Sequence, residues 1–309
     1  MSKEVRRAAE ILRAGGLVAF PTETVYGLGA DASSEKAMAR LYRVKGRPAD
    51  HPVIVHFSSS SDAFAWASEV PAEARKLAER FWPGPLTLIL KRSDKAKDFV
   101  TGGQPSVGVR VPSHPIAREL LKEFGKPIAA PSANRFGRVS PTTAAHVRED
   151  LGADVDLVLE GGPSEVGIES TIVDLSGSAP ALLRPGKISK DDLQKIISLG
   201  KAGASSRHSG GMEKHYAPKT PARLVPTHDL DKEISKAKAR AAVLAFSRPD
   251  ERVDFWLRMP RDPAAYAQKL YAALRELDGA NCDAILIEAP PAEPGWEAVL
   301  DRLQKATAP

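Results

Sequence analysis

Two threonine hydroxyls, a carboxylate and a phenol are crowded into five residues, 22–26, of the segment 20–31. Thr22, Glu23 and Thr24 follow an apolar run opened by a glycine pair, which predicts a buried strand that ends in a polar loop. Polar groups at such a strand end cost free energy unless hydrogen bonds satisfy them, and a bound polar ligand could supply those bonds. The alternative is a loop that caps the next helix. That role accounts for residues 31–34, but not for the two threonines and the carboxylate together.

A second group of residues has the chemistry of an anion site. Lys45 and Arg47 flank a glycine just after a predicted helix, which Pro48 ends. Arginine offers a planar fork of donors and lysine a point charge, a combination that suits a polyphosphate. The same spacing fits two cations that interact with the dipole of an ordinary helix C-terminus, and the sequence leaves both interpretations open. His56 ends an apolar run further on, where a lone histidine is more often a core residue.

A third group follows a buried strand that breaks at Pro131. Ser132 and Asn134 come directly after the break and could donate to phosphate oxygens while staying neutral. Ser140 precedes Pro141, a pattern typical of a helix N-cap with proline at the first helical position. A helix start also attracts anions, so the cap and ligand interpretations of Ser140 are equally open.

A fourth pair of polar groups lies at strand ends, with Ser170 before one predicted strand and Arg184 at the end of the next. A plain hairpin with charged ends explains this pair by itself. The chain has no glycine-rich phosphate loop after a strand, no His-Glu-x-x-His and no Gly-x-Ser-x-Gly. With cations, hydroxyls and amides but no evident nucleophile, the pattern favours a reaction driven by positioning and charge stabilisation.

The elements that position these groups alternate between helical and strand patterns. Helices are expected near 4–14, 35–44, 61–69, 71–80, 114–124, 142–150, 189–198, 229–238, 263–278 and 297–303. Strands are expected near 16–20, 53–57, 86–91, 107–111, 127–130, 156–159, 171–175, 181–184, 222–225, 241–246 and 284–287. Since both fully apolar and alternating strands occur, the pattern predicts an α/β fold with a mixed sheet.

Composition divides the chain into two parts and excludes several classes of protein. Residues 199–211 are rich in glycine and serine, which predicts a flexible linker. We therefore expect one domain over 1–198, a linker that acts as a lid over 199–221, and a smaller domain over 222–309. No apolar run approaches the roughly 18–20 residues of a membrane span, and the N-terminus lacks an apolar signal core. We expect a cytoplasmic protein.

Charge and cysteine content add further limits. The single cysteine, Cys282, excludes an internal disulfide and a cysteine-based metal cluster. The formal net charge of the 309 residues is +5 and the pI is near 9.2. This mildly basic balance fits an anionic substrate or contact with nucleic acid.

Taken together, these motifs resemble the YrdC/Sua5 family of threonylcarbamoyl-AMP synthases, in its longer Sua5 form. The resemblance runs through residues 21–29, 45–47, 83–87, 109–112, 130–134, 169–171 and 183–186, and through 211–212 and 215–218 of the linker. It implies a twisted mixed sheet with a large concave cavity and a smaller, Rossmann-like C-terminal domain. It also implies a reaction in which L-threonine, bicarbonate and ATP give L-threonylcarbamoyl-AMP and pyrophosphate. A threonylcarbamoyl transferase complex then modifies adenosine 37 of tRNA, which the enzyme serves indirectly.

The resemblance also implies roles for individual residues. The ATP contacts are Lys45, Arg47, His51, Ser106, Ala130, Ser132, Asn134, Ser140, Arg184 and Tyr216. The L-threonine contacts are Thr24, His56, Arg110 and Ser170. Arg110 would pair with the carboxylate of threonine, Lys45 and Arg47 would stabilise charge on the phosphates, and Tyr216 would belong to the lid. A magnesium ion would accompany the triphosphate without protein side chains as ligands, while Thr22 and Glu23 receive no firm role.

Two other classes of function are weighed against the synthase. An RNA-binding module on a basic concave face would show steep salt dependence of its affinity. The low aromatic content, 6%, argues against stacking on single strands. A carbamoyl-transfer module of the hydrogenase-maturation type would be accompanied by zinc fingers, which one cysteine excludes.

Overall fold

The chain forms two compact units. The computed structural model describes residues 2–200, 207–208, 210–237 and 240–309. The first unit comprises residues 1–136, 141–165 and 169–211, and the second comprises residues 137–140, 166–168 and 212–309. Of the predicted flexible linker over 199–211, residues 201–206 and 209 lie outside the described residues.

A mixed sheet of nine strands is the framework of the described part of the first unit, in the order β7-β1-β2-β6-β3-β5-β4-β8-β9. Its strands are β1 (Val18–Phe20), β2 (Gly27–Asp31), β3 (Val55–His56), β4 (Leu86–Lys91), β5 (Ser106–Arg110), β6 (Ile128–Ala129), β7 (Leu157–Val158), β8 (Thr171–Asp174) and β9 (Ala181–Arg184). Its helices are α1 (Lys3–Arg13), α2 (Glu35–Lys45), α3 (Ser60–Phe64), α4 (Ala72–Phe81), α5 (Asp98–Thr101), α6 (Pro115–Phe124), α7 (Ala144–Leu151) and α8 (Lys190–Gln194), with a 3-10 turn η1 (Gly152–Asp154). Parallel and antiparallel strand pairs both occur, which confirms the predicted mixed sheet.

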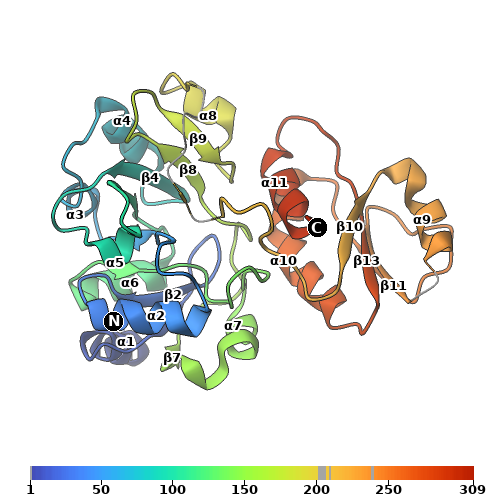
Figure 1. The fold of residues 1–309 in the computed structure, drawn as a ribbon, viewed down its shortest axis with the longest axis horizontal. Coiled ribbons are helices and arrows are strands. Elements are labelled where there is room, and N and C mark those ends of the chain that lie inside the picture. The colour runs from blue at the N-terminus through green and yellow to red at the C-terminus, as the bar shows by residue number, and fades with distance from the viewer. Residues whose placement is uncertain (1, 201–206, 209, 238–239) are drawn as a thin grey trace. The chain divides into compact units, whose positions relative to one another are not determined.

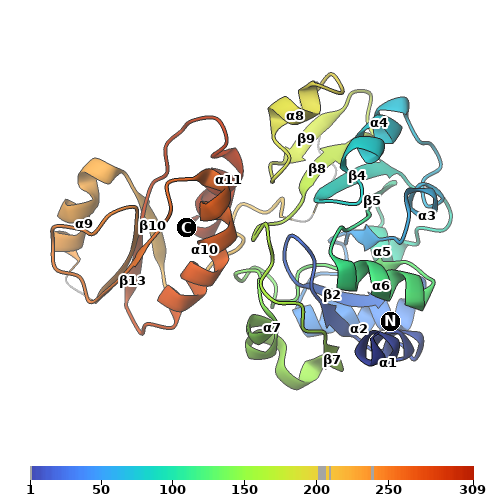
Figure 2. The same ribbon diagram turned by 180° about the vertical axis from the view of Figure 1, so that it is seen from behind.

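Helices α1 and α6 cover one face of the sheet at its β1, β2 and β6 side (Figure 2). Successive side chains of a strand point to opposite faces. Val18 and Phe20 of β1 therefore join Leu12 of α1 and Leu120 of α6 in one apolar cluster. Ala19 points the other way and belongs to the larger cluster that includes α2 and α4. Both faces of β1 are thus filled by apolar side chains.

Strand β2 corrects the prediction that residues 20–31 continue as a polar loop. It pairs antiparallel with β1 on one side and with β6 on the other. Its two glycines make this strand hard to predict from the sequence, because glycine is depleted in strands. Packing requires one of them: a Cβ at Gly29 would lie 2.9 Å from the ring of Phe20. The polar loop is confined to the residues before β2.

The N-caps of α2 and α7 are hydroxyl residues. Ser34 caps α2 by accepting the backbone N–H three residues on, at 3.3 Å, as that segment predicts. Of the two open interpretations of Ser140, the helix cap is wrong, because Thr143 accepts the capping N–H of α7 at 3.2 Å. The helix starts late because the carbonyl of Pro141 accepts the backbone N–H of Tyr26 at 2.9 Å, which ties this segment to the polar loop.

Two predicted helices are shorter than their sequence patterns. The helix expected over 61–69 ends at Phe64, because the chain turns there to join β4: the N–H of Ser68 donates to the carbonyl of Lys91 at 2.9 Å. The helix expected over 189–198 ends at Gln194. Within the described residues, no helix is both long and apolar enough to span a membrane.

The second unit contains an open sheet whose four described strands are all parallel, in the order β10-β13-β11-β12. Its strands are β10 (Ala222–Val225), β11 (Ala241–Ala245), β12 (Phe255–Arg258) and β13 (Ala284–Glu288). Its helices are α9 (Leu230–Lys236), α10 (Pro263–Asp278) and α11 (Glu297–Ala306), with a 3-10 turn η2 (Thr227–Asp229). Helix α9 lies on one face of this sheet, and α10 and α11 lie on the other (Figure 1). The sequence pattern misses β12, and residue 238 of the helix expected over 229–238 lies outside the described residues.

Candidate functional site

A row of side chains crosses the first sheet from β3 to β9. His56 lies opposite Arg110, and the register of β4 against β5 places Thr87 beside Arg110. Thr87 lies opposite Ile172, and Ile172 lies opposite Arg184. Opposed residues of neighbouring strands project from the same face. Three predicted site residues, His56, Arg110 and Arg184, therefore share one face of the sheet.

Arg110 forms a buried ion pair with Glu23. One guanidinium nitrogen lies 2.6 Å from a Glu23 carboxylate oxygen, and the two side chains are 5% and 4% exposed. The other oxygen of Glu23 accepts the N–H of Ser113 at 3.1 Å. Burial alone would raise the pKa of Glu23, but the Arg110 charge and hydrogen bonds outweigh burial and hold that pKa below its usual value. Arg110 also donates to Thr24 Oγ1 at 3.0 Å and to the carbonyl of Gly84 at 3.3 Å.

Thr22 folds the polar loop back on itself. Its hydroxyl donates to the carbonyl of Val25 at 2.6 Å and accepts the N–H groups of Thr24 and Val25, each at 3.2 Å. Bonds of this kind between a hydroxyl and nearby backbone fix a turn. The Thr22 hydroxyl also lies 2.8 Å from that of Thr24. Thr22 therefore shapes the loop, and Thr24 is the hydroxyl that the loop holds beside Arg110.

His56 supplies a neutral nitrogen beside the same arginine. The side chain is buried, and its Nδ1 has no hydrogen-bond partner among the described residues. Burial first, and then the charge of Arg110, lower the pKa of His56 well below its usual value. The edge of the imidazole packs against Phe20, with ring centroids 6.3 Å apart. A buried nitrogen without a partner is costly, so Nδ1 of His56 is open to a polar ligand, and a role for His56 in binding stays a prediction.

Ser170 links the strands at the other end of the row. Its hydroxyl lies 2.8 Å from that of Thr87. Arg184 donates to both the carbonyl and the hydroxyl of Ser170, at 3.0 and 3.1 Å. Strands β8 and β9 do form an antiparallel pair, as the hairpin interpretation expects. The fold nonetheless brings together one residue predicted for threonine, Ser170, and one predicted for ATP, Arg184.

Lys45, the last residue of α2, is enclosed by protein. Its ammonium donates to the carbonyls of Ser132 at 2.5 Å and Asn134 at 2.7 Å. Burial, followed by the charge of Arg47, lowers the pKa of Lys45 well below the usual lysine value. The helix stops here because Gly46 adopts a left-handed conformation, with φ of 64°. Lys45 thereby joins α2 to the segment that follows β6.

Arg47 and His51 lie together on the adjacent loop. The Arg47 guanidinium donates to the carbonyls of Pro52 at 2.7 Å and His51 at 3.4 Å. It also lies 5.3 Å from the ring of Phe136, which packs against the His51 ring at 5.4 Å. Burial and the charge of Arg47 lower the pKa of His51. Arg47, His51 and the more distant Phe136 thus form a cluster of cationic and aromatic side chains.

The segment after β6 contributes through its backbone. Ala130 has its methyl group in the apolar cluster of α1 and α6, and its N–H donates to the carbonyl of Ile54 at 3.0 Å. Ser132 forms an isolated antiparallel bridge with Gly27. The side-chain amide of Asn134 donates to the next carbonyl at 2.8 Å. Backbone pairing therefore holds this segment against both neighbouring strands.

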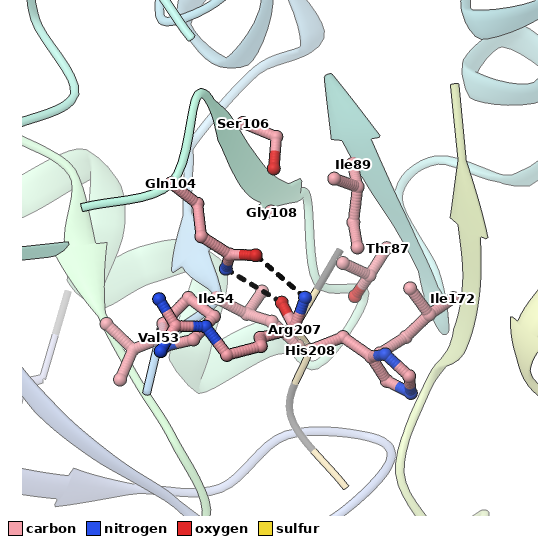
Figure 3. Close-up of a pocket in the computed structure, with 11 residues that line it drawn as sticks. Val53, Ile54, Thr87, Ile89, Gln104, Ser106, Gly108, Ile172, Arg207 and His208 are labelled. Carbon is pink, nitrogen blue, oxygen red and sulfur yellow. Dashed lines mark hydrogen bonds between the residues drawn. The ribbon is translucent and has the colours of Figure 1, made fainter. Parts of the chain in front are cut away.

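A small pocket lies on the same sheet face as the row (Figure 3). Its volume is about 20 Å³, which is enough for roughly one water molecule. Ser106, the predicted ATP contact on β5, lines it together with Thr87. Arg207 from the linker covers it: Gln104 donates to the Arg207 carbonyl at 2.9 Å and accepts the Arg207 N–H at 2.7 Å. The predicted larger concave cavity stays a prediction.

Two predicted ATP contacts, Ser140 and Tyr216, belong to the second unit. Both are buried. Tyr216 has a φ of 60°, which is uncommon for a residue other than glycine. Its ring stacks on Tyr271 with centroids 5.8 Å apart, and the Arg302 guanidinium lies 5.3 Å from the ring. A role for these two residues in ATP binding stays a prediction.

The site that these contacts define is suited to holding an anion and orienting a polar molecule. Fixed cations and hydroxyls are the groups that stabilise developing negative charge. Within the described residues, no group of three or more His, Cys, Asp or Glu side chains is placed to hold a metal ion.

The sequence alone did not predict a partner for Glu23. The charge of Arg110 could have identified Glu23 as its partner, because a buried arginine requires an anion nearby.

Family models account for almost the whole chain. Residues 10–186 match the Sua5_yciO_yrdC model, described as telomere recombination. Residues 188–308 match the Sua5_C model, described as the C-terminal domain of threonylcarbamoyl-AMP synthase. This chain belongs to the Sua5 family. As a member of that family it is an enzyme.

Curated relatives are similar along almost their full length. The threonylcarbamoyl-AMP synthase of Pyrococcus abyssi is 39% identical over 98% of this chain and 94% of its own length. The corresponding protein of Bacillus subtilis is 38% identical over 98% of this chain and 92% of its own. The crystal structure of P. abyssi Sua5 complexed with L-threonine matches with a TM-score of 0.90 at 38% identity, over 98% of this chain and 94% of that one. The mixed α/β fold is thus that of a Sua5 protein.

Proposed function

We propose that this Sua5-family enzyme is an L-threonylcarbamoyladenylate synthase, a nucleotidyltransferase that converts L-threonine, bicarbonate and ATP into threonylcarbamoyl-AMP and pyrophosphate. The observation that carries the proposal is the row of polar side chains on one sheet face, with Arg110 beside Thr24 and His56. Relatives named threonylcarbamoyl-AMP synthase support it. So does the P. abyssi Sua5 complex with L-threonine.

We assign the amino-acid substrate to the Arg110 end of the row. Arg110 binds the carboxylate of threonine, a planar partner that suits the guanidinium fork. Glu23 holds that fork in place through the buried ion pair. Thr24, His56 and Ser170 provide hydroxyls and a neutral nitrogen for the amine and hydroxyl of threonine. A neutral His56 adds no second cation where a substrate amine must react as a nucleophile.

We assign the nucleotide to Lys45, Arg47, Ser132 and Asn134, with His51, Ser106, Ala130 and Arg184 around it. When the carbamate oxygen of the substrate attacks the α-phosphate, negative charge grows on the phosphoryl group and on the departing pyrophosphate. Fixed cations stabilise that charge without reorganisation. Lys45 is positioned for this task by two backbone carbonyls. The Arg184 contact with Ser170 joins the nucleotide and threonine groups.

Magnesium would arrive with ATP. The site offers cations, hydroxyls and amides, whereas magnesium prefers oxygen anions, so the phosphates themselves would hold the ion. Its chemistry there is to neutralise charge on the leaving pyrophosphate. Apart from Glu23, which acts through Arg110, every protein group assigned above would act on the substrates directly.

We further propose the cellular setting and the architecture that follow from the family. The product passes to a threonylcarbamoyl transferase complex that modifies adenosine 37 of tRNA in the cytoplasm, so the enzyme serves tRNA indirectly. The division is a catalytic domain over 1–198, a linker and lid over 199–221 that contains Tyr216, and a Rossmann-like domain over 222–309. The catalytic domain would have a large concave cavity for both substrates.

The direct test is pyrophosphate release by the purified full chain with ATP and magnesium. Release should require both L-threonine and bicarbonate, and omission of either should reduce it to background. An Arg148→Ala variant, which loses an exposed ion pair with Glu160, should match the unaltered chain. Absence of threonine-dependent pyrophosphate from folded protein would reject the proposal.

A further inference from the structure

The carboxyl edge of the second unit's sheet has a topological switch point between β11 and β13. These strands are neighbours, and all four strands of the sheet are parallel. From the end of β11 the chain continues to β12 on one side. From the end of β13 it enters α11, which packs against β10 on the other side. In open parallel sheets, ligands bind outside the carboxyl ends of the strands where the connections diverge in this way.

Glu288 ends β13 at this switch point and is 5% exposed. One of its oxygens accepts the N–H of Phe246, the residue after β11, at 2.7 Å. No cation among the described residues pairs with this carboxylate. Buried carboxylates are otherwise rare unless they are paired or coordinate a ligand. The second carboxylate oxygen accepts no hydrogen bond from the described residues, although Glu288 lies near enough to Tyr266 that, after burial, its charge helps to raise the pKa of that phenol. This oxygen is open to a donor from outside the chain.

Two arginines lie around the same residue, Phe246. Arg258 at the end of β12 donates to the Phe246 carbonyl at 3.3 Å. The Arg261 guanidinium lies 5.4 Å from the Phe246 ring. No carboxylate of the described part of the chain pairs with either guanidinium. A buried carboxylate and two solvent-exposed arginines, neither paired with a carboxylate of the described residues, thus lie around a single residue at the switch point.

We propose that this edge of the second unit binds a ribonucleotide, with Glu288 accepting hydrogen bonds from the ribose hydroxyls and Arg258 and Arg261 binding the phosphate. A carboxylate at the end of a strand is the group that parallel sheets use for ribose hydroxyls. Arginine forks suit phosphate. They take the place of a glycine-rich loop, which the sequence lacks after β10.

The backbone of Phe246 holds a carboxylate and a guanidinium next to each other. Glu288 accepts the N–H of Phe246, and Arg258 donates to its carbonyl. A ligand that contacts both groups would need hydrogen-bond donors and an anion, and the hydroxyls of a ribose and a phosphate supply them.

The experiment is equilibrium dialysis of the full chain with radiolabelled ATP, scored as molecules bound per chain. The unaltered chain should bind two, one at each unit, and Glu288→Gln should bind one. Glu288→Gln keeps an acceptor for the Phe246 N–H, so the fold is retained. A paired Lys45→Met and Arg47→Met variant should lose the other molecule. Replacing ATP by its 2′,3′-dideoxy analogue should weaken the Glu288-dependent site about tenfold or more.

The outcomes separate this site from the proposed synthase. Glu288→Gln should leave threonine-dependent pyrophosphate release unchanged, and Glu233→Gln, on the surface of the same unit, should bind two molecules of ATP. One ATP per unaltered chain, with the same value in Glu288→Gln, would overturn the second site and leave the synthase proposal intact. An unchanged count in Glu288→Gln with a lowered melting temperature would show that Glu288 only secures the loop after β11.

Discussion

A guanidinium nitrogen of Arg110 lies 2.6 Å from a carboxylate oxygen of Glu23, although the two residues are far apart in the sequence. Both side chains are almost completely buried. Glu23 belongs to the polar loop before β2, whereas Arg110 ends β5. The pair therefore fastens the loop to the centre of the sheet and aims the guanidinium along the row that His56 begins. Removing one partner of a buried pair leaves an uncompensated charge.

Glu23→Ala should destabilise the first unit by about 3–5 kcal/mol, because Arg110 would remain buried without its anion. Chemical denaturation followed by tryptophan fluorescence measures the change. The matched control is Glu69→Ala, which breaks the exposed pair with Lys91 and should cost about 0–1 kcal/mol. Equal losses in the two variants would contradict a structural role for the buried pair.

Arg110→Ala should weaken L-threonine binding more than ATP binding, by about tenfold or more for threonine. The charge-assisted bond to the carboxylate is lost, while the groups around Lys45 are untouched. Titration calorimetry with each ligand separately measures both affinities. If ATP affinity falls further than threonine affinity, the two pockets have been assigned the wrong way round.

The residue types of the site could be predicted from sequence more fully than their arrangement. Hydroxyls, cations and amides at strand ends identify Thr24, Lys45 and Ser132 because such groups need partners. The row from β3 to β9 could not be predicted, since it depends on register between strands that are distant in sequence. Short-range patterns do not determine which residue of β5 lies opposite β3.

Helices and strands agree with their predictions where the local sequence determines them, and differ where tertiary contacts do. The helix over 263–278 agrees with its prediction because a capping Asp and a proline mark its start. Strand β2 escaped prediction because glycine is depleted in strands, whereas Gly29 here serves tertiary packing against Phe20. The helix start after Ser140 moved because Pro141 is held by Tyr26. In both cases a distant contact overrides the local pattern.

His56 should make the fold less stable in mild acid. Its folded pKa lies well below the usual 6.5, so between these two values only the unfolded chain binds the proton. Stability therefore rises with pH through this window and is lost as pH falls below about 6.5, by up to about 1.4 kcal/mol per pH unit. Denaturation at pH values above and below the window should show a smaller acid loss in His56→Asn. The same replacement at exposed His228 should leave the acid-induced loss of stability unchanged. If His56→Asn also shows the full loss of stability, His56 is not its source.

Lys45 should take up a proton when ATP binds. In the free protein, burial and Arg47 depress its pKa well below 10.5, and the negative charge of the triphosphate would raise that pKa again. Between the two values of pKa, binding must therefore be accompanied by proton uptake. Calorimetry at mildly alkaline pH in two buffers of different ionisation enthalpy measures the number of protons. Lys45→Met should abolish the uptake and weaken ATP binding, whereas Lys76→Met on the exposed side of α4 should preserve both. Uptake that persists in Lys45→Met would place the nucleotide phosphates away from this lysine.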